Sequence, residues 1–317
     1  SRSLTLIGTY LFQAWRLSET QCWGNNVATA IIGVTLLFCL LGLVGNGIVL
    51  WFLGFRIKRN LFTVYVLNLA AADFGFLLCL PISLTVYVAH LFNLLFLITI
   101  MDLLLVFTYS TSLYLLTAIS AERCVSVLFP IWHRCRRPTH LSAIVCALLW
   151  ALSCLFSGLR AYFCFSDSYE RCMVVLAQLT GTSFLIFTPI MVLSSLILII
   201  KVRCSSQRRP PGKLYVVILL SVLFFLLFIV PFSILAFFLN IVNYSHFIAT
   251  GFMLASLNSS INPVIYFFVG SYKKRQFRGT IKKALQNVFN DEANTSEKWA
   301  GWRKLLTVLF EDGTLAQ

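Results

Sequence analysis

The chain has 317 residues, of which 59% are hydrophobic and 11% are charged, and its formal net charge is +14. Soluble domains have about 45–50% apolar and about 25% charged residues, so this composition excludes an ordinary soluble protein and indicates a membrane protein. The basic residues lie in short clusters between apolar runs and not on one polar face with interleaved aromatics, which argues against nucleic acid as a partner.

Seven apolar runs are long enough to cross a bilayer as helices, which takes about 20 residues each. Lipid requires these runs to be helical, because unpaired backbone groups in hydrocarbon are costly. The predicted fold class is an all-α membrane protein with a seven-transmembrane helix bundle at 27–270, preceded by an N-terminal segment at 1–26. The spans are Val27–Leu53, Leu61–Ala89, Leu95–Leu128, Leu141–Gly158, Met173–Val202, Leu214–Asn240 and Phe247–Val269.

The charge of the connecting segments predicts the orientation, because cytoplasmic loops are rich in Lys and Arg. The clusters at 56–59, 134–137 and 201–213 and the segment after the last span are basic, whereas the opposite loops and the N-terminus have Arg2, Arg16, Arg160 and Arg171. We therefore expect an extracellular N-terminus and a cytoplasmic C-terminus.

A basic, amphipathic stretch follows the last span at 271–290. It predicts a helix on the anionic inner leaflet, with membrane lipids as partners, although a solvated basic tail is the alternative. Residues 291–317 then form a cytoplasmic tail.

Most of the spans contain a polar or helix-breaking residue, and such groups are expensive in lipid and usually functional. Their order resembles the rhodopsin-like, G-protein-coupled receptors, with SAERC in place of the acidic-Arg-aromatic triplet and NPVIY as the NPxxY motif. These residues are Asn46, Asp73, Glu122, Arg123, Trp150, Pro189, Pro231, Asn262, Pro263 and Tyr266.

Four segments are similar to the Mas-related receptors in particular: GFRIKRN, LFPIWHRCRRP, LSAIVCALLWALS and INPVIYFFVGS. This resemblance implies a plasma-membrane receptor that binds an extracellular small metabolite or peptide and activates a heterotrimeric G protein, Gq and/or Gi. It also implies arrestin as a further partner and expression in sensory neurons, with a role in nociception or itch.

The resemblance also implies roles for single residues. Glu122 and Arg123 would satisfy each other at rest, and Arg123 would turn toward the G protein on activation. Many relatives add a carboxylate at the start of the sixth helix, but residues 210–220 contain no Asp or Glu. The other residues assigned to coupling and activation are Leu113, Pro189, Phe225, Pro231, Asn262, Pro263 and Tyr266.

In a rhodopsin-like packing, Asp73 would face Ser112, Asn258 and Asn262. These oxygens resemble the family's allosteric sodium pocket, and we expect no other cofactor. A protonated Asp73 in a plain hydrogen-bond network is the alternative, because a buried carboxylate needs partners in either case.

The extracellular end of the predicted bundle differs from that of most rhodopsin-like receptors, since the extracellular part of the third span contains no cysteine. Cys164 and Cys172 resemble the Mas-related disulfide between the fourth and fifth helices, which an oxidising exterior permits; two unpaired thiols are the alternative. The sequence also has a glycosylation sequon at Asn243, although its closeness to the membrane disfavours modification.

The short FSDSYER loop predicts a wide, open ligand pocket. Arg160 and Leu176 stand where relatives carry carboxylates, so we expect an anionic group on the ligand. Arg160 as an interfacial anchor, or paired with an aspartate, is the alternative. The residues expected to bind the ligand are Asp102, Leu105, Arg160, Tyr162, Leu176, Phe232 and Phe252.

Three other classes fit less well. A transporter or ion pump, the main alternative, would need internal repeats and a chain of membrane carboxylates, but the spans contain mainly Asp73 and Asp102. A retinal photoreceptor requires a lysine in the seventh span, and Phe247–Val269 contains none. An intramembrane enzyme would need a motif such as HExxH, which is absent from the sequence, so we expect no catalytic residues.

Overall fold

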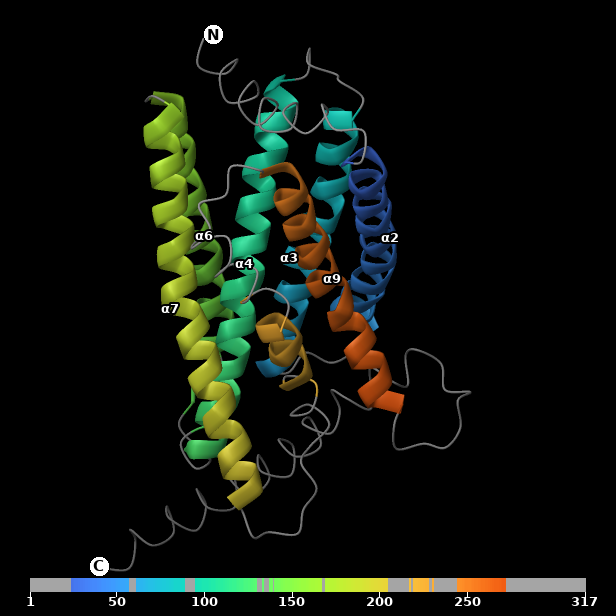
Figure 1. The fold of residues 1–317 in the computed structure, drawn as a ribbon. Coiled ribbons are helices and arrows are strands. Elements are labelled where there is room, and N and C mark those ends of the chain that lie inside the picture. Colours follow the sequence, from blue (N-terminus) through green and yellow to red (C-terminus); the bar gives the residue numbers. More distant parts are fainter. Residues whose placement is uncertain are drawn as a thin grey trace, which may run out of the picture.

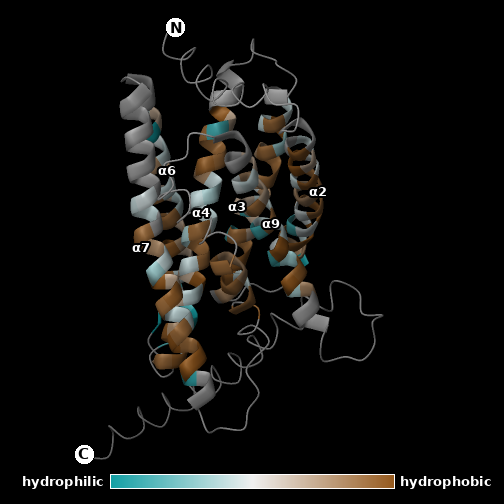
Figure 2. Ribbon diagram, viewed as in Figure 1, coloured by the Kyte–Doolittle hydropathy of each residue, from teal (hydrophilic) through white to brown (hydrophobic). Residues whose placement is uncertain are grey.

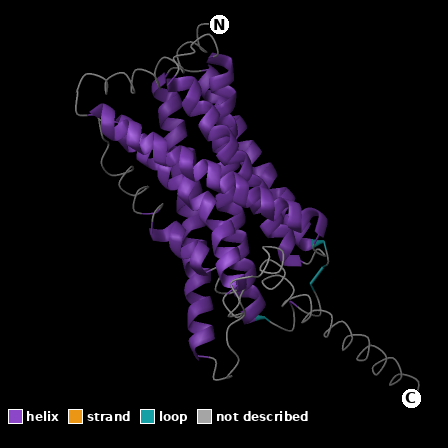
Figure 3. Ribbon diagram, turned by 90° about the vertical axis from the view of Figure 1, so that its right-hand side faces the viewer, coloured by secondary structure: helices purple, strands orange, loops and turns teal. Residues whose placement is uncertain are grey.

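Six long α-helices and one short π-helix form a bundle, and the described residues contain no β-strand (Figures 1 and 3). The computed structural model describes residues 24–56, 61–88, 95–129, 133, 137–138, 140–166, 169–204, 217, 219–227, 230 and 244–271. The amphipathic helix expected at 271–290 lies outside these residues, apart from Ser271, as do residues 1–23 and the tail.

The helices follow the predicted spans in chain order. They are α2 (Gly24–Trp51), which continues as the π-helix η1 (Phe52–Arg56), then α3 (Leu61–Val88), α4 (Leu95–Leu128), α6 (Leu141–Ser166), α7 (Tyr169–Cys204) and α9 (Tyr244–Ser271). Of the sixth predicted span, positions 217, 219–227 and 230 are described and helical, and we call them the sixth segment.

The prediction that the fourth span ends at Gly158 was wrong, because α6 continues to Ser166. Gly158 has open space around the position of a Cβ atom, so no close approach or turn marks the end of a helix there. The residues that follow include Leu159, Ala161 and Phe163, and helical pairing satisfies their backbone groups where apolar surroundings offer no other partner.

Five of the helices are long and apolar enough to cross a membrane: Thr29–Arg56, Phe62–Thr85, Ile100–Leu128, Leu141–Phe163 and Gly181–Lys201. The helix α9 is comparable in length but is not among these five, and it carries a run of polar residues at 256, 258–260 and 262.

The outer faces of the bundle are apolar, unlike those of a soluble protein, and the buried interior holds polar side chains as well as apolar ones. Leu40 and Leu185 are 63% and 72% exposed, whereas Asn46, Asp73 and Asn262 are buried. Figure 2 shows the same pattern, with mostly hydrophobic helices and isolated hydrophilic positions. The exposed apolar side chains are suited to lipid contact.

The helix α4 lies between two groups, with α6 and α7 on one side and α2, α3 and α9 on the other (Figure 1). The helices α2 and α9 approach closely at Gly42, where an added Cβ atom would lie 2.7 Å from Ser260 Cβ and 2.6 Å from Leu77 Cδ1. We call the end of the bundle where α2 and α4 begin the outer end, and the opposite end, where α9 ends, the inner end.

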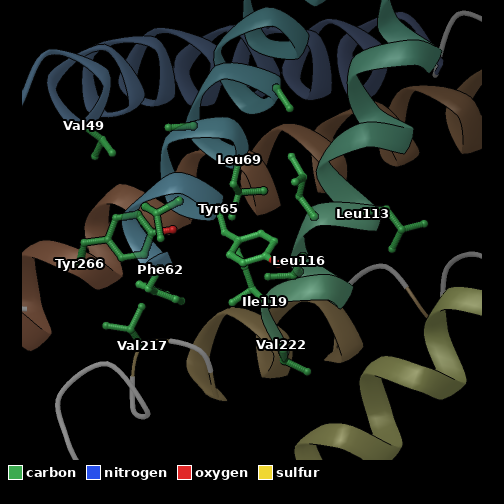
Figure 4. Close-up of a cluster of buried hydrophobic side chains, with 14 of the residues drawn as sticks. Val49, Phe62, Tyr65, Leu69, Leu113, Leu116, Ile119, Val217, Val222 and Tyr266 are labelled. Atoms are coloured by element: carbon green, nitrogen blue, oxygen red, sulfur yellow. The ribbon is translucent and has the colours of Figure 1, made fainter. Parts of the chain in front are cut away.

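The larger core cluster fills the inner half of the bundle and takes buried side chains from all six long α-helices, from η1 and from the sixth segment, with α3 and α4 contributing most of them. Figure 4 shows Tyr65 at its centre, with Phe62, Tyr266 and Val217 gathered on one side. The side chains from α3, α9 and the sixth segment therefore share one apolar environment there.

Candidate functional site

A polar centre lies in the middle of the bundle around Asp73 on α3, whose side chain is buried. Ser112 on α4 donates its hydroxyl to Asp73 Oδ1 at 2.7 Å. Asn262 on α9 donates Nδ2 to Asp73 Oδ2 at 2.9 Å. Three helices are thus joined through a single carboxylate, and both of its oxygens accept hydrogen bonds.

Two oxygen atoms of the residues beside this centre are buried without a well-formed hydrogen bond to the described residues. Asn46 on α2 donates Nδ2 to the carbonyls of Gly42 and Ser259 at 3.0 and 3.1 Å. Among the described residues its Oδ1 atom makes no hydrogen bond, and the Ser259 hydroxyl lies near Asp73 without a well-formed hydrogen bond. A buried oxygen without a partner is costly, so these atoms fit a small cation or water as a ligand.

Asn258 is buried on α9, but in the described part of the chain no hydrogen bond joins it to Asp73. Of the four residues expected to form the sodium pocket, the structure therefore brings Asp73, Ser112 and Asn262 into direct contact. The oxygen-rich surroundings fit the expected sodium ion, which is a hard cation that prefers oxygen ligands.

A charged cluster lies at the inner end of α4, around Glu122. Its Oε1 atom is 2.8 Å from His133 Nε2 and 2.8 Å from Arg137 Nη1. Arg137 also donates Nη2 to the Ser142 hydroxyl on α6 at 2.7 Å. The Glu122 carboxylate therefore joins the inner end of α4 to the segment that connects α4 and α6. Arg137 of that segment in turn contacts α6.

Arg123, the next residue, lies against an aromatic ring. Its guanidinium carbon is 4.1 Å from the centroid of Phe62, in the first turn of α3. Figure 4 shows Phe62 beside Tyr266 and Val217. The arginine expected to bind a G protein therefore lies over the side of the core cluster that α9 and the sixth segment share.

Two of the residues assigned to coupling and activation, Leu113 and Phe225, are buried in this same cluster. Pro189 lies inside α7 and is exposed. Pro231 lies outside the described residues.

The helices α4 and α7 are joined by aromatic and hydroxyl contacts. Tyr114 stacks on Phe187 with ring centroids 4.0 Å apart, and its hydroxyl is 2.8 Å from the Ser183 hydroxyl. Nearer the inner end, the Ser120 hydroxyl is 2.7 Å from that of Ser194. These contacts hold α7 against α4 over several turns.

At the outer end, Asp102 on α4 accepts a hydrogen bond from the Ser83 hydroxyl on α3 at 3.2 Å. Leu105 is buried in a second core cluster, with Phe252 packed against it. Tyr162 is 64% exposed on α6, and Arg160 is partly buried on the same helix. The structure thus brings Asp102, Leu105 and Phe252 to the α3–α4–α9 side, and Arg160 and Tyr162 to α6.

Several outer residues lie outside the described part of the chain. Cys164 falls in the last turn of α6 and Cys172 in the first turn of α7, but their side chains are not described. The same holds for the side chain of Leu176, and for Phe232 and Asn243. The predicted disulfide and glycosylation site therefore remain predictions.

Comparison with known proteins agrees with this arrangement. A model of the family described as 7 transmembrane receptor (rhodopsin family) matches residues 45–266. The chain is 44% identical to the proto-oncogene Mas of Mus musculus over 270 residues, which cover 80% of this chain and 81% of that protein. It is 40% identical to the Mas-related G-protein coupled receptor member X2 of Homo sapiens over 317 residues, which cover 92% and 95%.

The chain belongs to the Mas-related receptors of the rhodopsin family. The resemblance inferred from the motifs is confirmed, and so is the all-α, seven-transmembrane fold class. This receptor is a multi-pass protein of the plasma membrane, its partners are an extracellular ligand and a G protein, and its family consists of receptors and not of enzymes.

Some residues of this receptor's site were not found from the sequence. Arg137 counted only toward the charge of a basic loop, His133 appeared only within a segment that resembles the Mas-related receptors, and Phe62 counted only toward the length of an apolar run. One signal for these partners was present in the sequence. In the segment LFPIWHRCRRP, three arginines and a histidine follow the single acidic residue at the inner end of the third span.

Proposed function

We propose that this receptor binds a small metabolite or short peptide with an anionic group at its outer end and activates Gq or Gi at its inner end. The orientation, with the N-terminus extracellular, follows from the basic loops. By resemblance to the Mas-related receptors, we extend the proposal to sensory neurons, with a role in nociception or itch. Arrestin is proposed as a further partner on the inner face.

The observation that carries the proposal is the position of Arg123. Its cation lies at the inner end over Phe62. Phe62 is buried in the same cluster as Val217 of the sixth segment and Tyr266 of α9. A movement of the sixth segment away from α4 would therefore change the surroundings of Arg123. In the proposed function, this movement exposes a binding surface for a Gα subunit.

The proposed mechanism is a shift of population between two states. Ligand contacts at the outer end favour a state in which the sixth segment has moved outward. The polar centre at Asp73 lies between the two ends and joins α3, α4 and α9. We propose that a sodium ion bound there stabilises the resting arrangement, because the cation would bind the carboxylate that holds the three helices together.

A cell-based screen tests this function. The full chain is expressed at the cell surface, and calcium and cAMP are recorded while small anionic metabolites and short peptides are added. Calcium release without a cAMP change indicates Gq, and a fall in cAMP indicates Gi. The matched control is Arg123→Gln at equal surface expression, which should lose the response. A response that survives Arg123→Gln unchanged would contradict the proposed coupling site.

A further inference from the structure

Phe62 lies in the first turn of α3 with only 2% of its surface exposed. The guanidinium of Arg123 stands over its ring, 4.1 Å from the centroid. The face of an aromatic ring carries partial negative charge, so it attracts a cation, and it does so more strongly when both groups are shielded from water. Phe62 is buried and Arg123 is partly buried, so this pair lies between an exposed and a fully shielded contact of its kind.

The carboxylate next to Arg123 is shared with two further basic side chains, and it also interacts electrostatically with Arg123. Glu122 is bound by Arg137 and His133, each at 2.8 Å. Among the described residues of the inner end, Glu122 is the one carboxylate, and two guanidinium groups and an imidazole surround it. An aromatic face is a suitable neighbour for the second guanidinium, because it offers negative potential without a further buried charge.

The ring of Phe62 also connects Arg123 to the elements expected to move. Phe62, Val217 and Tyr266 belong to one buried cluster (Figure 4). Outward movement of the sixth segment would remove Val217 from this cluster and admit water to the ring, which weakens a cation–π contact. Residues 210–220 have no carboxylate with which to hold Arg123 to the sixth helix.

We propose that Phe62 is the positioning residue that holds Arg123 in the resting state, by a cation–π contact that is broken when the sixth segment moves outward. The ring takes the place of the carboxylate that many relatives carry at the start of the sixth helix. The proposal rests on the proposed function, because it assumes that Arg123 couples the receptor to a G protein.

Fluorinated phenylalanines at position 62 test the contact directly. Mono-, di- and trifluorophenylalanine keep the shape of the ring closely while they progressively remove the negative potential of its face. The series is made in the full chain, once with Arg123 and once with Arg123→Gln. The same series at Phe76, which is also 2% exposed and pairs with Tyr109 instead of a cation, is the matched control.

Two measurements are made on each purified variant: the thermal unfolding midpoint, and ligand-free nucleotide exchange on purified Gq and Gi. With Arg123 present, each fluorine at position 62 should lower the midpoint and raise the exchange rate. The trifluoro variant should reach roughly a 5- to 30-fold higher rate, the factor that corresponds to a partly shielded cation–π contact. With Arg123→Gln, and in the Phe76 series, fluorination should have no graded effect on the midpoint.

Equal midpoint changes in the Arg123 and Arg123→Gln backgrounds would overturn the proposal, because the effect would then not involve the cation. A graded midpoint with a constant, measurable exchange rate would also overturn it, since the contact would not restrain the active state. Absence of exchange from every variant, including the wild type, would count against the proposed function instead, and the midpoints would still decide whether Phe62 holds Arg123.

Discussion

Arg137 and Glu122 form an ion pair that ties the inner end of α4 to the segment entering α6, with Nη1 2.8 Å from Oε1 and side chains that are 3% and 13% exposed. Removing one partner of such a pair leaves a shielded charge without its counterion. We therefore expect Arg137→Met to lower the free energy of unfolding by about 1–3 kcal/mol, the range for hydrogen bonds to charged groups.

The double variant Glu122→Gln, Arg137→Met is the control for that pair. Because it removes both charges, it should unfold at a higher temperature than Arg137→Met alone. Thermal unfolding of the purified receptor in detergent measures the wild type, the two single variants and the double variant. Purely additive losses would show that the two side chains do not stabilise each other.

The polar centre predicts a sodium effect that depends on Asp73. In the wild type, replacing choline chloride by sodium chloride should raise the unfolding midpoint and change agonist affinity, because the cation binds the folded state. Asp73→Asn should abolish both effects, since a neutral amide cannot balance the charge of the cation. Asp102→Asn, at the outer aspartate, should keep them. Sodium sensitivity that persists in Asp73→Asn would rule out this site.

The close approach of α2 to its neighbours predicts different outcomes for two glycines of the same helix. Gly42→Ala would place a Cβ atom 2.6 Å from Leu77 Cδ1 and 2.7 Å from Ser260 Cβ, so the helices must move apart. We expect a loss of about 1–3 kcal/mol, the cost of overpacking a core.

Gly33→Ala is the matched control on α2, since nothing lies within 4 Å of its Cβ position. It should be neutral or stabilise the receptor by about 0.5–1 kcal/mol, because alanine favours the helix over glycine. Surface expression and the unfolding midpoint report both variants. Equal behaviour of the two would contradict the close packing at Gly42.

The charge of Arg160 predicts the ligand class. Arg160→Ala should weaken an anionic agonist by about 1–3 kcal/mol, the scale of one lost charge-assisted hydrogen bond. Arg160→Glu should weaken it further and admit a cationic agonist. Concentration–response curves for calcium measure both variants. An agonist that is indifferent to both changes would assign Arg160 to anchoring at the membrane interface.

The expected disulfide predicts a non-additive pattern. Cys164→Ser and Cys172→Ser should each reduce surface expression or signalling, and the double variant should be no worse than either single one, because the bond is lost once either partner is gone. Surface labelling and thiol titration measure these forms. A free thiol at Cys164 in the native receptor would exclude the bond.

Much of the polar centre could be predicted from the sequence, because a carboxylate in an apolar span must find partners and few polar groups are available at that depth. Ser112 and Asn262 do contact Asp73. Asn258 lies on the same face of α9 as Asn262 but about one turn, roughly 6 Å, nearer the outer end, and no hydrogen bond joins it to Asp73 in the described part of the chain.

The partners of Glu122 at the inner end could be predicted less well. Adjacency in the sequence suggested that Glu122 and Arg123 satisfy each other. Arg123 does act electrostatically on Glu122, but the groups 2.8 Å from the Glu122 carboxylate belong to His133 and Arg137. Those contacts depend on the path of the chain after α4, and hydrophobic periodicity carries no information about the path of a connection. The end of α6 was missed for a related reason, because a glycine in an apolar run does not by itself stop a helix.

The junction of α6 and α7 has a consequence for how long a ligand stays bound. Since α6 ends at Ser166 and α7 begins at Tyr169, only residues 167 and 168 connect them. Two residues cannot fold over the bundle, so this connection supplies no lid that must open before a ligand leaves. Departure of a ligand past α6 and α7 should therefore depend on the strength of its contacts with these two helices, and for ligands bound there dissociation rates should follow affinity across a series.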